Sequence, residues 1–287
     1  MFLSGCTAKA PQSEKLIAVS FYPVYIFTLN IVGDIDGVRV ECMAEQNTGC
    51  LHDYTVTAKD ARLLSDCDVF VVNGAGMEAF VQDLYETVES LNVLDSSAGA
   101  SVICSHSHEE EEHEGHHHSE NSHIWMSVDN AIIQTKNICE GLCEVFPQYK
   151  EAFLENASGY ISRLEKLKLE IASAGNILSG AKVITFHNAY EYLFSDMGIS
   201  VVETIESDEG GEPSAKALCS LVDLITSENI NSLFVEPNYD GSSAEILSNE
   251  TGARVYVLNP VLNGEKNKTA YEDIMRGNLE IILRAVK

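Results

Sequence analysis

Positive charge is scarce in this sequence. Its 287 residues include 18 Lys and Arg against 44 Asp and Glu, which gives a formal net charge of -26 at pH 7. A surface this acidic repels phosphate backbones and anionic lipid headgroups, so electrostatic binding to nucleic acid or to an anionic bilayer is excluded as a main function. The same excess of negative charge attracts cations.

Long hydrophobic runs and paired cysteine motifs are missing as well. The chain has no run of about 18 apolar residues, which excludes a membrane-spanning helix. None of its 8 cysteines belongs to a CxxC pair, so the sequence shows neither a thiolate zinc site nor a thioredoxin-type redox motif. Hydrophobic residues still make up 45% of the chain, enough for globular lobes with their own cores.

A short motif near the N-terminus predicts attachment to a membrane. Leu3-Ser4-Gly5-Cys6 resembles a bacterial lipobox, in which the cysteine is diacylated and everything before it is removed. We expect residues 1–14 to be a lipobox remnant and tether, with Cys6 as the site of lipidation. The protein is then extracytoplasmic, either lipid-anchored in the cell membrane or periplasmic.

Alternating strand and helix patterns predict an α/β fold with two lobes, each a mostly parallel sheet flanked by helices. The N-terminal lobe spans residues 15–146 and the C-terminal lobe spans 181–287. Between them, residues 147–180 contain a helical pattern without an interior proline, which spans about 45 Å at 1.5 Å per residue and connects the lobes. The expected strands are 15–21, 38–43, 68–73, 92–94, 101–104, 182–186, 200–204, 232–235 and 254–258. The expected helices outside the connector are 22–32, 57–65, 77–90, 128–145, 189–197, 214–229, 242–251 and 271–286.

The first lobe contains an acidic, histidine-rich loop over residues 105–121. The segment from 106 to 118 has no apolar residue, so it cannot bury surface and should be solvated, binding cations loosely in several arrangements. A low-complexity loop without a role is the alternative. The auxiliary metal-binding histidines of this loop are His106, His108, His113, His116, His117 and His118.

Three histidines outside this segment follow expected strands. His52 comes after the second strand, His123 after the last strand of the first lobe, and His187 after the first strand of the second lobe. Loops at the carboxyl ends of parallel strands converge on ligands, so we expect the three imidazoles to meet between the lobes. Three imidazole nitrogens and one oxygen form a coordination shell that zinc accepts. The apolar residues 124–126 should hold His123 rigidly.

Several stretches resemble the zinc-binding solute receptors of bacterial metal ABC importers, in the cluster whose two lobes are joined by one long helix. The resemblance covers residues 15–287 and implies that His52, His123 and His187 bind the metal. Manganese receptors of this fold usually carry a carboxylate where this chain has His187, and imidazole suits zinc better. The matching segments are His52-Asp53-Tyr54, Asn73-Gly74-Ala75-Gly76, His123-Ile124-Trp125, Phe186-His187-Asn188-Ala189, Glu212-Pro213-Ser214 and Phe234-Val235-Glu236-Pro237.

The fourth ligand stays open between three candidates. Family members often have an Asp after the last strand, where this chain has Asn259. Water or the Asn259 side-chain oxygen is the first expectation, and Glu206 from an acidic loop is the next. Glu236 also follows a strand, but Pro237 fixes the chain beside it, so packing or a hinge is the expected role of Glu236.

The resemblance implies a monomeric receptor that captures Zn²⁺ between its lobes and delivers it to an ABC permease and its ATPase. A manganese or iron receptor of the same family is the alternative. A mononuclear zinc hydrolase would use a similar ligand set, but the sequence has no H-E-x-x-H motif, and we expect no enzymatic activity. A structural or adhesive surface protein is a further alternative, favoured only by the lipobox and the acidic surface.

Overall fold

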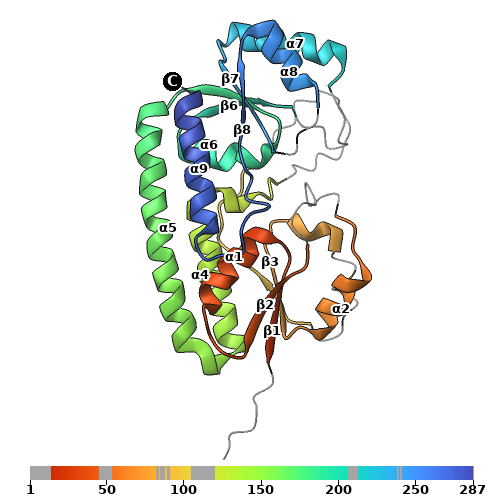
Figure 1. Ribbon diagram of the computed structural model, residues 1–287, viewed down its shortest axis with the longest axis vertical. Helices are drawn as coiled ribbons and strands as arrows, with labels where there is room; N and C mark the ends of the chain where they lie inside the picture. Colours follow the sequence, from red (N-terminus) through yellow and green to blue (C-terminus); the bar gives the residue numbers. More distant parts are fainter. Residues whose placement is uncertain are drawn as a thin grey trace, which may run out of the picture.

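The computed structural model describes residues 14–44, 54–81, 84, 88, 91–104, 120–205, 213–237, 239 and 241–286. Within these residues it contains two four-stranded parallel sheets flanked by helices, and one long helix runs beside both sheets (Figure 1). This architecture confirms the predicted α/β fold with two lobes joined by a long helix.

The sheet of the N-terminal lobe has the strand order β2-β1-β3-β4, with every neighbouring pair parallel. Alternate residues of a strand point to opposite faces, so both faces of this sheet must be covered. Ile17 and Val19 belong to a core shared with the rest of the molecule, whereas Leu16 and Ala18 belong to a smaller cluster on the other face. The strands are β1 (Lys15–Val19), β2 (Val38–Cys42), β3 (Val69–Val72) and β4 (Val93–Asp95).

Helices cover these two faces as the sequence pattern predicts. The smaller cluster includes Leu63 and Leu64 of α2 (Ala58–Asp66). Thr57 caps α2, because its hydroxyl accepts from the Asp60 amide while the Asp60 carboxylate accepts from the Thr57 amide. The shared core includes residues of α1 (Tyr22–Val32) and α4 (Val128–Val145), and a 3₁₀ helix, η3 (Ile124–Met126), leads into α4.

The connecting helix α5 (Lys150–Leu178) is 29 residues long, as expected for a helix that reaches both sheets. It follows a 3₁₀ turn, η4 (Pro147–Tyr149), and packs against α4 and α1. Its buried stripe includes Phe153, Leu164, Leu167 and Ile171, which recur at helical spacing.

The sheet of the C-terminal lobe repeats the plan, with the order β6-β5-β7-β8 and parallel pairing throughout. Val183 and Phe234 face the shared core, and Ile184 and Leu233 face a second cluster. The strands are β5 (Lys182–Thr185), β6 (Ser200–Thr204), β7 (Ser232–Val235) and β8 (Arg254–Val257). The helices are η5 (Asn188–Tyr190), α6 (Glu191–Asp196), α7 (Ala215–Ser227), α8 (Ser243–Thr251) and α9 (Ala270–Ala285).

One local prediction is wrong, and a second can be followed only over part of its length. Residues 101–104 do not form a strand; they make one isolated bridge, between Cys104 and Glu120. The backbone of Ser101 is instead paired with the side chain of Asn130 on α4 in both directions, at 2.8 and 2.9 Å. The helix expected at 77–90 begins as a 3₁₀ helix, η2 (Met77–Val81), and most of 82–90 lies outside the described residues.

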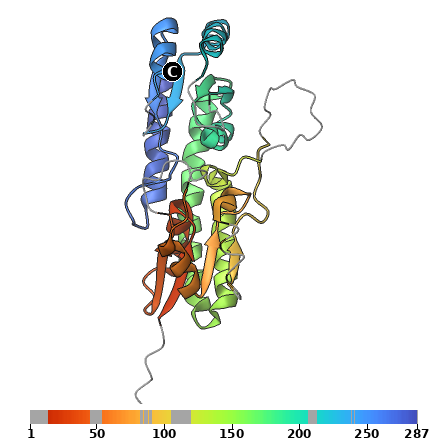
Figure 2. The ribbon, with the colours of Figure 1, turned by 90° about the vertical axis from the view of Figure 1, so that its right-hand side faces the viewer.

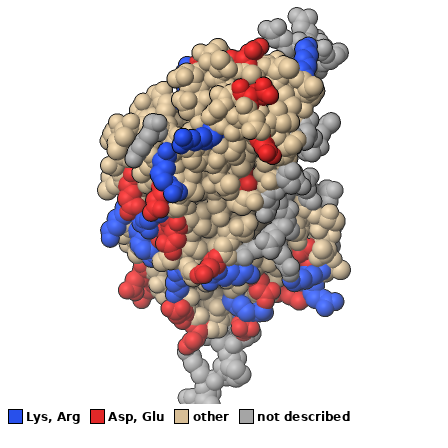
Figure 3. Space-filling model, turned by 45° about the horizontal axis from the view of Figure 1, so that its top comes forward, with Lys and Arg blue, Asp and Glu red and all other residues tan. Residues whose placement is uncertain are grey.

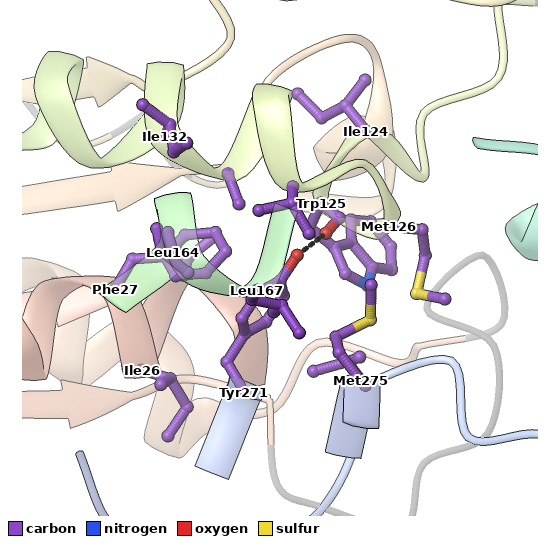
Figure 4. Close-up of a cluster of buried hydrophobic side chains, with 14 of the residues drawn as sticks. Ile26, Phe27, Ile124, Trp125, Met126, Ile132, Leu164, Leu167, Tyr271 and Met275 are labelled. Atoms are coloured by element: carbon purple, nitrogen blue, oxygen red, sulfur yellow. Dashed lines mark hydrogen bonds between the residues drawn. The ribbon is translucent and has the colours of Figure 1, made fainter. Parts of the chain in front are cut away.

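One apolar core joins the two lobes. It extends from β1 to α9 and includes the contact between Phe27 and Tyr271, whose ring centroids lie 5.2 Å apart. Figure 4 shows Tyr271 donating its hydroxyl to the carbonyl of Trp125, at 2.7 Å, among side chains from α1, α5 and α9. The N-terminal and C-terminal lobes are therefore parts of one packed unit.

The chain between β8 and α9, residues 258–269, crosses from the C-terminal lobe to the N-terminal lobe (Figure 2). We call it the crossing segment. Its carbonyls accept hydrogen bonds from Tyr22 and Asn30 of α1 and from the indole of Trp125. No helix in the described part of the chain combines the length and apolar character needed to span a bilayer.

Candidate metal centre

His187 lies two residues past the end of β5. The amide of Phe186 donates to the carbonyl of Phe234 at 2.8 Å, so the pairing between β5 and β7 continues beyond the regular strand. His187 itself keeps extended backbone angles, with φ -156 and ψ 137, and is 2% exposed. The strand exit predicted for this histidine is confirmed.

His123 is placed by a helix rather than by a strand. Because residues 101–104 form no strand, the predicted strand exit is wrong for this histidine; it lies directly before η3, and its carbonyl accepts from the amide of Met126. Ile124, Trp125 and Met126 are fully buried, so the rigid apolar flank is confirmed. The ring of His123 lies 5.1 Å from that of Trp125.

The structure brings these two histidines together from opposite lobes. Their ring centroids are 4.6 Å apart and the planes are nearly perpendicular, at 88°. His52 lies outside the described residues, as do Glu206, Cys6 and the six auxiliary histidines between 106 and 118. Within the described ranges, no group of three or more His, Cys, Asp or Glu side chains is arranged to hold a metal.

The Nδ1 atom of each ring faces a protein oxygen. His123 Nδ1 lies 2.9 Å from Asn121 Oδ1, and His187 Nδ1 contacts Glu236 Oε1. In the neutral form of each ring, an acceptor that faces Nδ1 favours a proton on that atom. The unprotonated nitrogen, which is the one that binds metals, is then Nε2 in both histidines.

The amide of Asn121 is oriented by two acceptors from the C-terminal lobe. Its Nδ2 donates to the carbonyl of Asn188 and to the carboxylate of Glu191, both at 2.9 Å. These bonds fix which end of the amide is oxygen, and that oxygen also accepts from the His123 amide at 3.1 Å. The residue that orients His123 is therefore itself held by the opposite lobe.

A buried polar network supports the backbone before His123. Asn73 follows β3, and its Nδ2 donates to the carbonyl of Ser122 at 3.1 Å. Gln134 of α4 donates to Asn73 Oδ1 at 3.0 Å. The carboxylate of Glu78 accepts from the Asn73 amide at 2.7 Å.

Glu78 is 5% exposed and has an unusual protonation equilibrium. Burial raises its pKa to about 7, against the opposing effect of hydrogen bonds from Ser20, Asn73 and Gly74. The two backbone amides bind separate carboxylate oxygens, which fixes the turn that follows β3. Gly74 and Gly76 have positive φ, both +80°, and an added Cβ at Gly74 would lie 2.0 Å from the Asp95 carboxylate.

These residues lie at the topological switch points of the two sheets. In each sheet the first strand lies between the second and the third, so the connections diverge beyond the carboxyl ends of β1 and β3, and of β5 and β7. His187 and Glu236 follow β5 and β7, and Asn73 follows β3. Ligands of open α/β sheets bind at this position.

Asn259 follows β8 but its side chain serves a turn. Its Oδ1 accepts from the amide of Val261 at 2.8 Å, and its backbone pairs in both directions with the side chain of Asn278 on α9. Val261 has a positive φ of 61°, which the turn requires. This bond occupies one of the two lone pairs of the candidate ligand oxygen.

Charge on the surface favours cation capture over long range. Figure 3 shows acidic and basic side chains interspersed on one face of the molecule. Several of the scarce basic residues are paired, for example Lys15 with Asp68 and Arg276 with Glu170. The remaining acidic residues outnumber the basic ones, and their negative charge attracts cations.

Sequence reasoning did not find the residues that orient the two rings. Packing or a hinge was expected for Glu236, and the structure adds a contact with His187 that was not expected. The available signal was its position after a strand that neighbours β5. Asn121 and Asn73 gave no signal of their own beyond their proximity in sequence to His123 and to the glycine turn.

The described part of the site consists of two imidazoles, which are nitrogen donors of the kind that divalent cations of borderline hardness accept. The Nδ1 atoms of both rings face protein oxygens, and apolar packing keeps His123 in place. Two nitrogens alone leave the remaining coordination positions to other ligands.

The chain matches the family described as zinc-uptake complex component A, periplasmic (ZnuA), over residues 17–285. It is similar to the zinc-binding lipoprotein AdcA of Streptococcus pneumoniae (strain ATCC BAA-255 / R6), with 31% identity over 293 aligned residues that cover 98% of this chain. The alignment covers 58% of that relative, so the chain spans little more than half of its length.

A second curated relative is matched over most of its length. The high-affinity zinc uptake system protein ZnuA of Bacillus subtilis (strain 168) is 29% identical over 286 residues, which cover 94% of this chain and 88% of that protein. Among solved structures, the solute-binding protein FpvC of Pseudomonas aeruginosa in complex with Mn²⁺ superposes with a TM-score of 0.84. It is 26% identical, and the match covers 96% of this chain and 99% of that one.

Proposed function

Because the chain belongs to the family of zinc-uptake complex component A proteins, we propose that it is an extracytoplasmic receptor that captures Zn²⁺ between its lobes and delivers it to an ABC permease. The observation that carries this proposal is the approach of His123 and His187, from opposite lobes, to 4.6 Å between ring centroids. In this proposal Zn²⁺ is the transported substrate and not a permanently bound cofactor.

The proposed ligands are the Nε2 atoms of His52, His123 and His187. The oxygens that face Nδ1 of His123 and His187 leave Nε2 as the metal-binding nitrogen of a neutral ring, which supports two of these assignments. The third rests on the sequence resemblance. Three imidazoles with one further oxygen satisfy the four-coordinate preference of zinc, and an exchangeable fourth position favours release to the permease.

For the fourth position we propose water or Asn259, with Glu206 as the next candidate. The hydrogen bond from Val261 already uses part of the Asn259 oxygen, which supports water as the first choice. Neutral oxygen donors also hold zinc less tightly than a carboxylate does, which suits a carrier that must unload.

The histidine-rich loop is proposed as an auxiliary collector. Its histidines, between 106 and 118, precede His123 directly in sequence, so weakly bound cations are concentrated near the site. Deleting residues 106–118 should remove weak, superstoichiometric zinc and leave one tight equivalent, because a loop that must order on binding loses affinity. Loss of the tight equivalent in this deletion would show that the loop supplies an essential ligand.

The partners proposed for the receptor are an ABC permease and its ATPase, with a lipid anchor at Cys6 and a monomeric state. We propose that the receptor binds and delivers the ion without catalysing a reaction. Two acyl chains suffice for stable attachment to a membrane. With a complete signal sequence, Cys6→Ser should release the protein into the soluble fraction, and unchanged membrane retention would argue against the anchor.

Zinc titration of single-histidine variants tests the receptor. Trp125 is the single tryptophan of the chain, and its ring lies 5.1 Å from that of His123. Its fluorescence should therefore report occupancy of the site. We expect one tight Zn²⁺ by calorimetry and a fluorescence change that saturates at one equivalent. His123→Ala and His187→Ala should remove both signals, whereas His113→Ala should preserve them.

The same titration separates zinc from manganese as cargo. Manganese is the alternative that the Mn²⁺-bound structural relative favours. Nitrogen-rich ligand sets prefer zinc, so Zn²⁺ should displace Mn²⁺ at equal concentration. Retention of Mn²⁺ in this competition would assign the manganese function.

A further inference from the structure

Glu236 is a charged residue beside a candidate metal ligand, and the ligand set expected from the sequence does not include it. It meets Nδ1 of His187 from a neighbouring strand exit. Glu236 is 22% exposed and His187 is 3% exposed at the side chain, so the pair is largely shielded from water. Hydrogen bonds to a charged acceptor are stronger in such surroundings.

The register of the sheet explains this meeting. Thr185 of β5 is paired with Phe234 of β7. Two residues further on, His187 and Glu236 are again side by side and point to the same face, because side chains alternate with a period of two. Pro237 favours extended backbone at the residue before it, which continues the strand geometry through Glu236.

The two described histidines are oriented by acceptors of different charge. Asn121 presents a neutral amide oxygen to His123, whereas Glu236 presents a carboxylate to His187. A carboxylate that accepts the Nδ1 proton pulls it toward oxygen, which increases the electron density at Nε2. The His187 ring thereby becomes the stronger nitrogen donor of the pair.

We propose that Glu236 is a positioning and specificity residue for the metal site, acting through His187. It fixes the tautomer and rotation of the ring and strengthens the bond between Nε2 and a borderline divalent cation. It also places negative charge one ring away from the cation without becoming a ligand. This proposal rests on the proposed receptor function and adds to it the origin of preference for a nitrogen-binding metal.

Three substitutions separate the contributions of Glu236. Glu236→Ala removes both orientation and charge and should weaken Zn²⁺ binding about 10–100-fold, the usual loss for an outer-sphere partner of a metal-binding histidine. Glu236→Gln keeps an acceptor oxygen without the charge, so its loss should be smaller. Glu236→Asp keeps the charge but shortens the reach, and it should not restore full affinity.

Selectivity provides a readout that a purely structural role would not change. Mn²⁺ depends more on oxygen ligands and less on imidazole donation than Zn²⁺ does. The ratio of Zn²⁺ to Mn²⁺ affinity should therefore fall in Glu236→Gln, while the temperature of unfolding without metal stays unchanged. An equal loss for both metals would overturn the specificity part of the proposal.

Co²⁺ absorption distinguishes positioning from direct ligation. If Glu236 only orients His187, the ligand-field bands of Co²⁺ in Glu236→Gln should keep the intensity of the wild type, with a lower affinity. A change of intensity that indicates a different coordination number would mean that Glu236 is itself a ligand. Wild-type affinity for Zn²⁺ in both Glu236→Gln and Glu236→Ala would show that it does neither.

Glu228→Gln is the matched control for charge. Glu228 pairs with Lys182 at the amino end of β5, so the substitution removes one negative charge from the same lobe at the opposite edge of the sheet. It should leave the affinities for both metals unchanged. If the wild-type protein itself fails to bind Zn²⁺, the receptor function fails, which is a result separate from any effect of Glu236.

Discussion

The protonation of a single buried carboxylate makes the stability of this protein depend on pH. Glu78 has a pKa of about 7, whereas its ordinary value is 4.5. Between these values the folded state binds more protons than the unfolded state, so the free energy of unfolding contributed by Glu78 falls as pH rises. Outside the interval this contribution is flat.

Glu78→Gln should therefore have a shallower dependence of unfolding free energy on pH between about 4.5 and 7. The difference in slope should add up to roughly 3 kcal/mol over the interval, because each pH unit between the two pKa values contributes about 1.4 kcal/mol. Urea unfolding at a series of pH values measures it. Parallel curves for variant and wild type would show that Glu78 titrates normally. The Gln amide also meets two backbone donors, so only the slope, not the absolute stability, tests this prediction.

Asn259 carries an amide nitrogen where an aspartate would carry a second carboxylate oxygen, so the side chain near the proposed fourth position is uncharged. Asn259→Asp keeps an oxygen that can accept from the Val261 amide, so the turn should survive. The added negative charge should tighten Zn²⁺ binding and raise Mn²⁺ affinity by a larger factor, because manganese prefers anionic oxygen. Calorimetric titration with both metals checks this. Unaltered affinity for each would mean that position 259 does not face the metal.

Among the secondary-structure elements, the interface of α5 with α9 contains two ion pairs of different kinds. Arg163 donates to Glu272 at 2.8 Å; the Arg163 side chain is 39% exposed, but that of Glu272 is only 2% exposed. Arg276 donates to Glu170 at 2.8 Å, but both side chains are about two-fifths exposed. Desolvation makes the loss of the first partner costly and the loss of the second nearly neutral.

Arg163→Ala should lower the free energy of unfolding by about 3 kcal/mol, since it leaves the buried Glu272 carboxylate without its cation. Arg276→Ala, the matched control, should cost less than about 1 kcal/mol. Chemical denaturation compares the two. Adding Glu272→Gln to Arg163→Ala should recover part of the loss, and an equal cost for both arginine variants would contradict the burial argument.

Most elements were predictable from local patterns, because the spacing of apolar residues within a segment indicates whether it forms a helix or a strand. The helix Val128–Val145 and the strands Ser200–Thr204 and Ser232–Val235 have the predicted bounds. Residues 101–104 are apolar like a strand, yet Asn130 supplies their hydrogen bonds. A tertiary partner of this kind cannot be read from the segment itself.

The candidate site was predictable only in part, for a similar reason. His123 and His187 were identified from their neighbours in sequence, and the structure places their rings together. The contact of Glu236 with His187 depends on the register between β5 and β7, which are separated in the chain by the helices α6 and α7 and the strand β6. The crossing segment likewise depends on packing against Tyr22 and Asn30 of the first helix.

At the scale of the whole molecule, the two sheets share one core. This core contains residues of α1, α4, α5, α6 and α9 and continues from one lobe into the other. The crossing segment adds hydrogen bonds from α1 and Trp125 across the same boundary. Each lobe also has a smaller apolar cluster of its own, but the shared core is completed only when both lobes are folded.

Thermal unfolding should therefore show one cooperative transition, although the fold has two lobes. Differential scanning calorimetry of the metal-free protein should give a calorimetric enthalpy equal to the van't Hoff enthalpy. Fluorescence of Trp125, which lies where the lobes meet, should change at the same temperature as far-ultraviolet circular dichroism. Two resolved heat-absorption peaks would indicate that the lobes unfold independently.

The contact of Phe27 with Tyr271 also has a consequence for synthesis. These rings join the first helix to the last, 5.2 Å apart in space and at opposite ends of the chain. At a translation rate of about 5–20 residues per second, roughly 12–50 seconds pass between the two residues leaving the ribosome. During that interval the first helix can pack against α4 and α5, but Phe27 lacks Tyr271, so the core shared by the two lobes stays incomplete until the last helix has been made.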